Sequence, residues 1–236
     1  MKKGALYLIP STLGDTAPVS SLPLDIQAVT GNLHYFIVED LRTARRFLKR
    51  ILPGISIDSL HFQVLNEHTG PEEVASMLTP VMAGKDTGLL SEAGLPCIAD
   101  PGARLVMHAH EKGVRVIPLT GPSSIFLALM ASGFNGQNFS FSGYLPIDKK
   151  QRLAKIKELE SAAYKYDQTQ IFIETPYRNQ HLMEALIGTC QPQTLVCLAV
   201  NLTLPEEWIA VRSVGQWKKT KWPDIQKKPA VFLIYR

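Results

Sequence analysis

The chain has 236 residues, of which 45% are hydrophobic and 19% charged, with a formal net charge of +4 at pH 7. This composition excludes an intrinsically disordered or fibrous chain and is typical of one large globular domain or two modest ones. The three cysteines, Cys97, Cys190 and Cys197, show neither metal-ligand spacing nor the even number of a disulfide framework. They favour a reducing cytoplasm, and the mild basicity favours an anionic partner such as RNA or a polycarboxylate.

In the first half, short apolar runs alternate with amphipathic segments. Strands are predicted at residues 5–9, 35–38, 62–65, 87–90 and 114–117, and helices from about residue 43, over 71–82 and over 103–112. Strand–helix alternation with short connections predicts a parallel sheet with helices on both faces. The most apolar runs, 5–9 and 125–130, are too short for a signal or membrane-spanning segment, so no membrane association is expected.

The second half has a different pattern. Helices are predicted up to about residue 132, over 149–165 and over 179–187, and strands at 139–145, 170–173, 194–199, 207–211 and 230–235. Consecutive strands there could pair antiparallel, with Trp208 in the core and Trp217 and Trp222 packing a terminal helix. The predicted fold class is therefore α/β with two lobes: an N-terminal α/β domain of residues 1–118 and a C-terminal mixed α+β domain of residues 119–236.

The most informative segment is the loop of residues 91–104, which directly follows a buried strand. Gly94 and Gly102 allow a ligand to approach the backbone closely, and the acids Glu92 and Asp100 can bind a cationic amine or ribose hydroxyls. The alternative is a tight loop in which Asp100 caps the next helix.

A second segment of interest, residues 121–124, follows a strand and opens a helix. Its free backbone N–H groups can hold a carboxylate or phosphate, or it can be a hinge with Ser123 or Ser124 as N-cap. No dinucleotide motif, Walker loop or metal-ligand motif occurs in the chain, so a metal site is not expected.

Seven segments occur in a characteristic order, at residues 10–15, 38–43, 66–69, 91–104, 121–124, 141–146 and 173–178. Together they resemble the tetrapyrrole (corrin/porphyrin) methylase family, in particular its branch of ribosomal small-subunit RNA (cytidine 2′-O) methyltransferases. The resemblance implies two α/β lobes, a cytoplasmic homodimer, and S-adenosyl-L-methionine bound in the cleft between the lobes. Because the sulfonium methyl is itself the electrophile, such a protein mainly has to position donor and acceptor.

Carried over residue by residue, the resemblance implies cofactor contacts from both lobes: Pro10, Ala93, Gly94, Asp100, Ser123, Ser124, Glu174, Pro176 and Asn201. Some positions depart from the family pattern. The first loop lacks the usual asparagine, Glu92 replaces an aspartate, and Val200-Asn201 stands where the family has an arginine and a glutamate.

The acceptor is the remaining question. A ribose 2′-hydroxyl is a poor nucleophile and benefits from a positioned base. We therefore hypothesise that Glu39 or Glu67 assists deprotonation and that Arg42 orients the RNA of the small ribosomal subunit. The alternative for these residues is helix capping and a solvated helix face. The alternative functions are methylation of a tetrapyrrole precursor and a non-catalytic module that binds S-adenosylmethionine.

Overall fold

The computed structural model describes residues 2–15 and 21–236 and divides into two compact units, Met1–Ser123 and Ser124–Arg236. The division falls after the segment 119–123, whereas the sequence placed the boundary before it. The physical reason is that the Leu119 backbone N–H donates to the Leu8 carbonyl oxygen at 3.0 Å, which ties this segment to the first unit.

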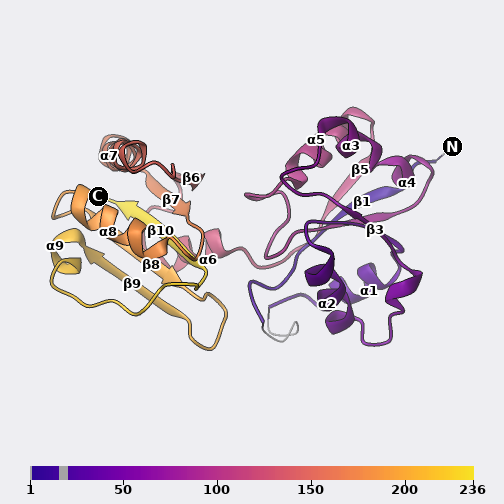
Figure 1. Cartoon of the computed structure of the whole chain (residues 1–236), viewed down its shortest axis with the longest axis horizontal. Helices are drawn as coiled ribbons and strands as arrows, with labels where there is room; N and C mark the ends of the chain where they lie inside the picture. The colour runs from indigo at the N-terminus through magenta and orange to yellow at the C-terminus, as the bar shows by residue number, and fades with distance from the viewer. Residues whose placement is uncertain (1, 16–20) are drawn as a thin grey trace. The chain divides into compact units, whose positions relative to one another are not determined.

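The first unit is built on a parallel five-stranded sheet, which confirms the predicted fold class of this half (Figure 1). Its strands are β1 (Ala5–Ile9), β2 (Tyr35–Val38), β3 (His61–Val64), β4 (Thr87–Leu90) and β5 (Arg115–Pro118), in the order β3-β2-β4-β1-β5. Every pairing is parallel. All four residues of the central strand β4 are buried, as expected of a parallel sheet covered on both sides.

Helices cover both faces of this sheet (Figure 1). On one face lie α1 (Asp25–Gly31) and α2 (Leu41–Ile51), which share a core with Ile9, Phe36 and Val38. On the other lie α3 (Pro71–Ser76), α4 (Thr79–Met82) and α5 (Gly102–Glu111), which share a core with Leu6, Ile37 and Leu89. A short 3-10 helix, η2 (Ile57–Ser59), precedes β3. Successive strand residues thus face opposite cores.

Two helices of the first unit differ from the prediction. The single helix expected over residues 71–82 is interrupted between α3 and α4, because Pro80 has no backbone N–H and the Thr79 hydroxyl donates to the Ser76 carbonyl oxygen instead, at 2.6 Å. Helix α2 begins at Leu41 rather than near Thr43, because the Asp40 carboxylate accepts a hydrogen bond from the Thr43 N–H at 2.7 Å and caps the helix.

The second unit has a mixed five-stranded sheet in the order β6-β7-β10-β8-β9. Its strands are β6 (Phe139–Tyr144), β7 (Thr169–Ile173), β8 (Leu195–Val200), β9 (Trp208–Ser213) and β10 (Ala230–Tyr235). Strands β8 and β9 pair antiparallel, as expected of consecutive strands. The expectation is wrong for β6 and β7, which pair parallel because the long helix α7 (Lys149–Tyr166) crosses over between them.

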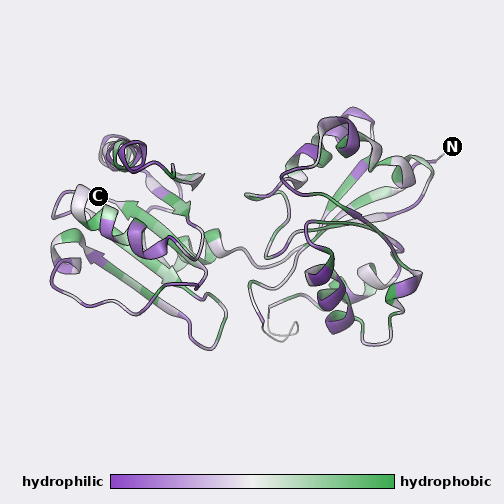
Figure 2. Ribbon diagram, in the orientation of Figure 1, coloured by the Kyte–Doolittle hydropathy of each residue, from purple (hydrophilic) through white to green (hydrophobic). Residues whose placement is uncertain are grey.

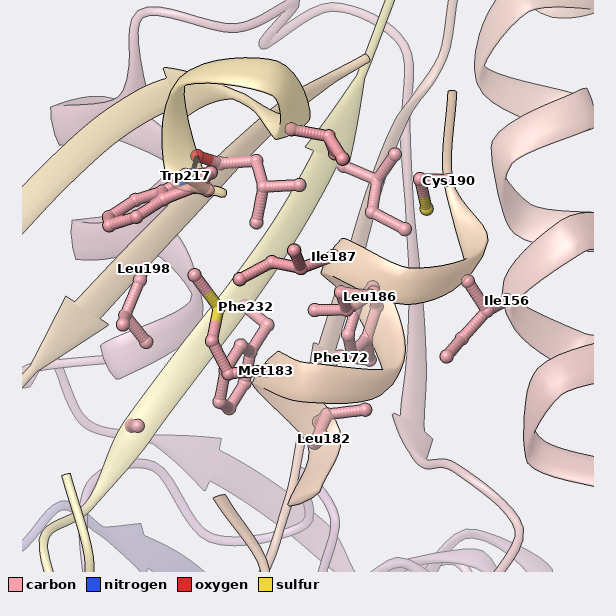
Figure 3. Packing of buried hydrophobic residues seen from close by; sticks show 14 of the residues in the cluster. Ile156, Phe172, Leu182, Met183, Leu186, Ile187, Cys190, Leu198, Trp217 and Phe232 are labelled. Carbon is pink, nitrogen blue, oxygen red and sulfur yellow. Dashed lines mark hydrogen bonds between the residues drawn. The ribbon is translucent and has the colours of Figure 1, made fainter. Parts of the chain in front are cut away.

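Three further helices, α6 (Ser124–Ser132), α8 (Asn179–Thr189) and α9 (Val214–Trp217), complete this unit. Figure 3 shows Met183 and Leu186 of α8 packed with Phe172 and Phe232 of the sheet. Trp217 is completely buried and donates its ring N–H to the Val196 carbonyl oxygen at 3.0 Å, while Trp208 is only partly buried. Trp208 packs against this core, as predicted, and Trp217 of α9 contacts the Trp222 ring at 6.3 Å but also belongs to the core itself.

None of the described helices combines the length and apolar character that crossing a bilayer requires.

Candidate functional site at the carboxyl edge of the parallel sheet

The loops that follow β1, β2 and β4 are hydrogen-bonded to one another. Because these strands are parallel, their carboxyl ends meet at one edge of the sheet, where ligands of such folds bind. The Ser11 backbone N–H donates to the Gly94 carbonyl oxygen at 2.9 Å. The Glu92 N–H donates to the Glu39 carboxylate at 3.1 Å. The edge is therefore one connected set of loops in the first unit.

The loop after β5 joins this set by close packing of backbone. A Cβ atom on Gly121 would lie 2.1 Å from the Pro10 Cβ, and one on Gly94 would lie 3.3 Å from the Pro122 carbonyl oxygen. Gly94 also has a φ of +73°, which favours glycine. A Cβ atom on Gly102 would lie 2.8 Å from Asp100 Oδ1 and 3.0 Å from the Leu89 side chain. Glycine at these positions therefore lets the loops after β1, β4 and β5 pack closely against one another.

The loop between β4 and α5 contains left-handed backbone at residues other than glycine. Cys97 has a φ of 71° and Ala99 a φ of 63°. Such conformations cost on the order of 1 kcal/mol or more each and cluster at ligand-binding sites. Asp100 stabilises the end of the loop by accepting a hydrogen bond from the Gly102 N–H at 2.8 Å. This strain supports a binding role, and sequence reasoning missed it because neither residue type signals a left-handed conformation.

Two buried oxygen atoms at this edge have no hydrogen-bond partner among the described residues, the Ser11 hydroxyl and Oδ2 of Asp100. A buried polar atom without a partner carries a desolvation cost, which a ligand can remove. A carboxylate oxygen accepts from an ammonium group or a ribose hydroxyl, both of which S-adenosylmethionine carries. The Ser11 hydroxyl was not among the predicted contacts. Pro10 beside it is buried against Gly121.

Burial perturbs two carboxyl groups of the site. Desolvation raises the pKa of Glu39. The hydrogen bond from the Glu92 N–H lowers this pKa, and the negative charges of the nearby Asp100, Glu92 and Asp40 carboxylates raise it further. Burial also raises the pKa of Asp100, against the lowering effect of the backbone N–H groups of Gly102, Cys97 and Ile98. A carboxylate with a raised pKa is a stronger base than an ordinary glutamate, which suits proton abstraction.

The other predicted catalytic residues are more exposed. Arg42 lies in the first turn of α2 with its side chain in solvent. The pKa of Asp40 is lowered mainly by the hydrogen bonds from Thr43, and the charge of Arg42 adds a smaller effect. Glu67 is exposed and forms an ion pair with His68 at 3.6 Å. No hydrogen bond or ion pair between described residues joins Glu67 to Glu39.

The remaining predicted contacts of the first loop set have simple environments. Ala93 is exposed and its carbonyl oxygen accepts from the Ser91 hydroxyl at 3.4 Å. Ser123 and Ser124 are partly buried, and α6 begins at Ser124.

In the second unit, Glu174 and Asn201 lie at one edge of the mixed sheet. Glu174 follows β7 and Asn201 follows β8, and both strands run antiparallel to β10 between them. Asn201 has a left-handed φ of 52° and donates its backbone N–H to the Pro229 carbonyl oxygen at 3.0 Å. The Pro176 carbonyl oxygen accepts from the Lys227 N–H at 2.9 Å. The segment before β10 thus connects the predicted contacts of this unit.

Glu174 is the most buried carboxylate of this edge, with 1% of its side chain exposed. Its Oε1 atom accepts from the Arg178 guanidinium at 2.6 Å and from the Thr175 N–H at 2.7 Å, while Oε2 has no partner among the described residues. Oε1 therefore stabilises the loop after β7, and only Oε2 is available to a ligand. Sequence reasoning missed Arg178, although it stands four residues after Glu174.

No group of three or more histidine, cysteine or acidic side chains able to hold a metal ion occurs in residues 2–15 and 21–236. The fold and the first loop set define a two-unit α/β protein with a candidate site at the carboxyl edge of its parallel sheet. Comparison with known proteins identifies the class further. Residues 36–217 match the family of Tetrapyrrole (Corrin/Porphyrin) Methylases.

Two relatives are named Ribosomal RNA small subunit methyltransferase I. The protein of Vibrio cholerae is 31% identical over 86% of this chain and 67% of its own length. That of Leptospira borgpetersenii is 35% identical over 93% of this chain and 84% of its own length. The crystal structure of the methyltransferase CobJ superposes with a TM-score of 0.66 at 18% identity, over 99% of this chain and 94% of that one, and shares the fold.

The chain therefore belongs to the tetrapyrrole methylase family and is a methyltransferase.

Proposed function

We propose that this methyltransferase uses S-adenosyl-L-methionine to methylate a ribose 2′-hydroxyl of the 16S RNA in the small ribosomal subunit. The observation that carries the proposal is the identity of 31–35% with relatives named for small-subunit ribosomal RNA, over 86–93% of the chain. The mildly basic net charge of +4 agrees with an anionic acceptor.

The carboxyl edge of the first sheet fits the cofactor. Asp100 Oδ2 and the Ser11 hydroxyl are buried acceptors without a partner among the described residues, and Gly94 and Gly121 allow the loops that carry them to pack closely. When bound, S-adenosylmethionine supplies the methyl group on a sulfonium. The proposed cofactor contacts in the first unit are Pro10, Ala93, Gly94, Asp100 and Ser123. In the second unit they are Ser124, Glu174, Pro176 and Asn201.

Glu39 is the proposed general base. Its carboxylate lies at the same edge as Asp100, close enough for the two charges to interact, and burial raises its pKa. Glu67 is the weaker candidate, because its side chain is exposed and paired with His68. Arg42, in the first turn of α2, orients the RNA by contact with a phosphate.

A tetrapyrrole precursor is the second candidate acceptor, favoured by the family match and by the fold shared with the methyltransferase CobJ. Calorimetry with S-adenosylmethionine tests binding common to both candidates. Transfer of labelled methyl groups to 30S subunits or to uroporphyrinogen then separates them.

The transfer assay includes Glu39→Gln, which keeps the acceptor for the Glu92 N–H but cannot take a proton. The proposal predicts label in 30S subunits, none in uroporphyrinogen, and a loss of about 10²-fold or more in the variant. Undiminished transfer by Glu39→Gln would exclude this residue as the base. Binding without transfer to 30S subunits would exclude the ribosomal acceptor.

The functional assembly is a cytoplasmic homodimer. Support comes from α6, where Phe126 and Met130 are four residues apart and exposed by 55% and 76%, and where the Phe126 ring meets Phe139 edge-on at 5.9 Å. Such an apolar helix face is typical of a subunit interface. The cysteines Cys97, Cys190 and Cys197 are free thiols, as a reducing compartment allows. Light scattering of the wild type and of Met130→Glu tests the dimer, which the variant should weaken.

A further inference from the structure

Helix α2 has an apolar side and a cationic side, and packing against the sheet requires only the apolar side. Its sheet-facing side is apolar, with Ala44, Phe47, Leu48 and Ile51 buried. The outward positions are all cationic and, at 100° per residue, fall within an arc of about 140°: Arg42, Arg45, Arg46, Lys49 and Arg50. No acidic residue occurs between Leu41 and Ile51. Figure 2 shows this helix largely in the hydrophilic colour.

The cations of α2 are not explained by ion pairing within the protein. Arg50 bonds to Asp15. Within the described ranges, no ion pair joins Arg42, Arg45, Arg46 or Lys49 to a carboxylate. The pKa of Asp40, the N-cap residue, is lowered mainly by hydrogen bonds from Thr43 and in part by the charge of Arg42.

The arrangement is also unfavourable for the helix itself. Like charges three or four residues apart, such as Arg42 with Arg46 and Arg45 with Lys49, repel one another. A cation in the first turn, such as Arg42, opposes the helix dipole, whereas Lys49 and Arg50 in the last turn suit it. A row of like charges that destabilises its own helix indicates a polyanionic partner that offsets the repulsion.

We propose that the outward face of α2, formed by Arg42, Arg45, Arg46 and Lys49, is the surface on which the phosphate backbone of an RNA docks. The inference rests on the proposed function and names the part of the chain that holds the RNA beside the acceptor nucleotide. Helix α2 begins directly after Glu39 and Asp40, at the carboxyl edge of the sheet, and runs away from it.

The length of the cationic face selects a polymer over a small polyanion. From Arg42 to Lys49 the helix rises about 10 Å, which spans several successive phosphates of one strand. Arg45 is held in place by the Phe62 ring, whose centre lies 5.5 Å from the guanidinium carbon.

The test removes three charges of this face in the full-length protein, as Arg45→Gln, Arg46→Gln and Lys49→Gln together. Arg42 stays, since it belongs to the proposed site, and Arg50 stays because of its bond to Asp15. The matched control removes three exposed lysines of α7, as Lys149→Gln, Lys150→Gln and Lys157→Gln. Thermal melting and calorimetry with S-adenosylmethionine verify that both variants fold and bind cofactor like the wild type.

The probes are a fluorescein-labelled 20-nucleotide single-stranded RNA of 16S sequence and purified 30S subunits. The α2 variant should bind the RNA roughly tenfold more weakly, and its slope of log affinity against log salt should be smaller by about 2, because three phosphate contacts are lost. The KM for 30S subunits should rise by a similar factor, while the α7 control matches the wild type. Should Arg45→Gln disturb folding, the double variant Arg46→Gln, Lys49→Gln gives the same test with a slope change of about 1.4.

The outcomes separate this inference from the proposed function. If the wild type methylates 30S subunits and the α2 variant keeps the wild-type salt slope and KM, the docking surface is wrong and the acceptor stands. If the wild type transfers no methyl group to 30S subunits but the α2 variant alone loses RNA affinity, the docking surface stands and the acceptor is wrong. Equal losses in the α2 and α7 variants would also overturn the inference, because they indicate only a general effect of charge.

Discussion

Gly121 packs against Pro10, so adding a single methyl group at Gly121 tests sharply whether the packing of these loops shapes the site. In Gly121→Ala the new Cβ would lie 2.1 Å from Cβ and 2.5 Å from Cγ of Pro10. Since carbon atoms pack at about 3.5–4.0 Å, the loop after β5 must move by about 1.5 Å. Overpacking of this kind costs about 1–3 kcal/mol of folding free energy. The larger effect falls on positioning, because a shift of about 1 Å can lower a rate about 10²-fold.

The assay combines urea unfolding, calorimetry with S-adenosylmethionine and methyl transfer. We expect Gly121→Ala to lower stability by about 1–3 kcal/mol and to reduce kcat/KM about 10²-fold. Gly54→Ala is the control in the same unit, since its Cβ would have no atom within 4 Å. If Gly121→Ala bound the cofactor and turned over like Gly54→Ala, the packing of these loops would not shape the site and the reasoning would fail.

Three further predictions concern titration and ion pairing. Burial raises the pKa of Glu39 above its value in the unfolded chain. The free energy of unfolding of the wild type relative to Glu39→Gln should therefore be greatest below pH 4.5 and fall as the pH rises through the raised pKa. Urea unfolding at several pH values measures this difference, and a difference that stays constant would contradict the prediction. Burial raises the pKa of the Cys97 thiol to about 12, so little reactive thiolate is present at pH 8. Iodoacetamide should label Cys97 on the order of 10³-fold more slowly in the folded protein than in urea, as followed by mass spectrometry. Equal labelling rates would contradict this prediction. Arg178→Met leaves the buried Glu174 carboxylate without its cation. Denaturant unfolding should show a loss of about 3 kcal/mol, and adding Glu174→Gln should recover part of this loss. If the double variant recovered nothing, the ion pair would not be the cause of the loss.

The parallel sheet was predictable from the sequence because its strands are apolar runs bounded by turn residues. Strands β1, β2 and β4 have the predicted limits. Helix α1 was not predicted, because its seven residues span barely two turns and Leu24, at its N-cap, supplies no capping side chain. The parallel pairing of β6 with β7 depends on the crossover of α7, and strand patterns alone do not determine it.

The candidate site was predictable where chemistry depends on residue type and not where it depends on conformation. Gly94 and Gly102 predicted close approach of a ligand to the backbone, and in the structure both positions are closely packed against other residues of the protein. The left-handed backbone of Cys97 and Ala99 is imposed by the fold of the loop, against the preference of these residue types. The missing partner of the Ser11 hydroxyl likewise follows from tertiary packing, which no local pattern encodes.

The proposed reaction transfers a methyl group from S-adenosylmethionine to a ribose of 16S RNA. The most direct measurement incubates the protein with radiolabelled cofactor and 30S subunits, digests the RNA to nucleosides and separates them by chromatography. We expect label in a 2′-O-methylated cytidine. Label on a base, or none in RNA while uroporphyrinogen is methylated, would contradict it.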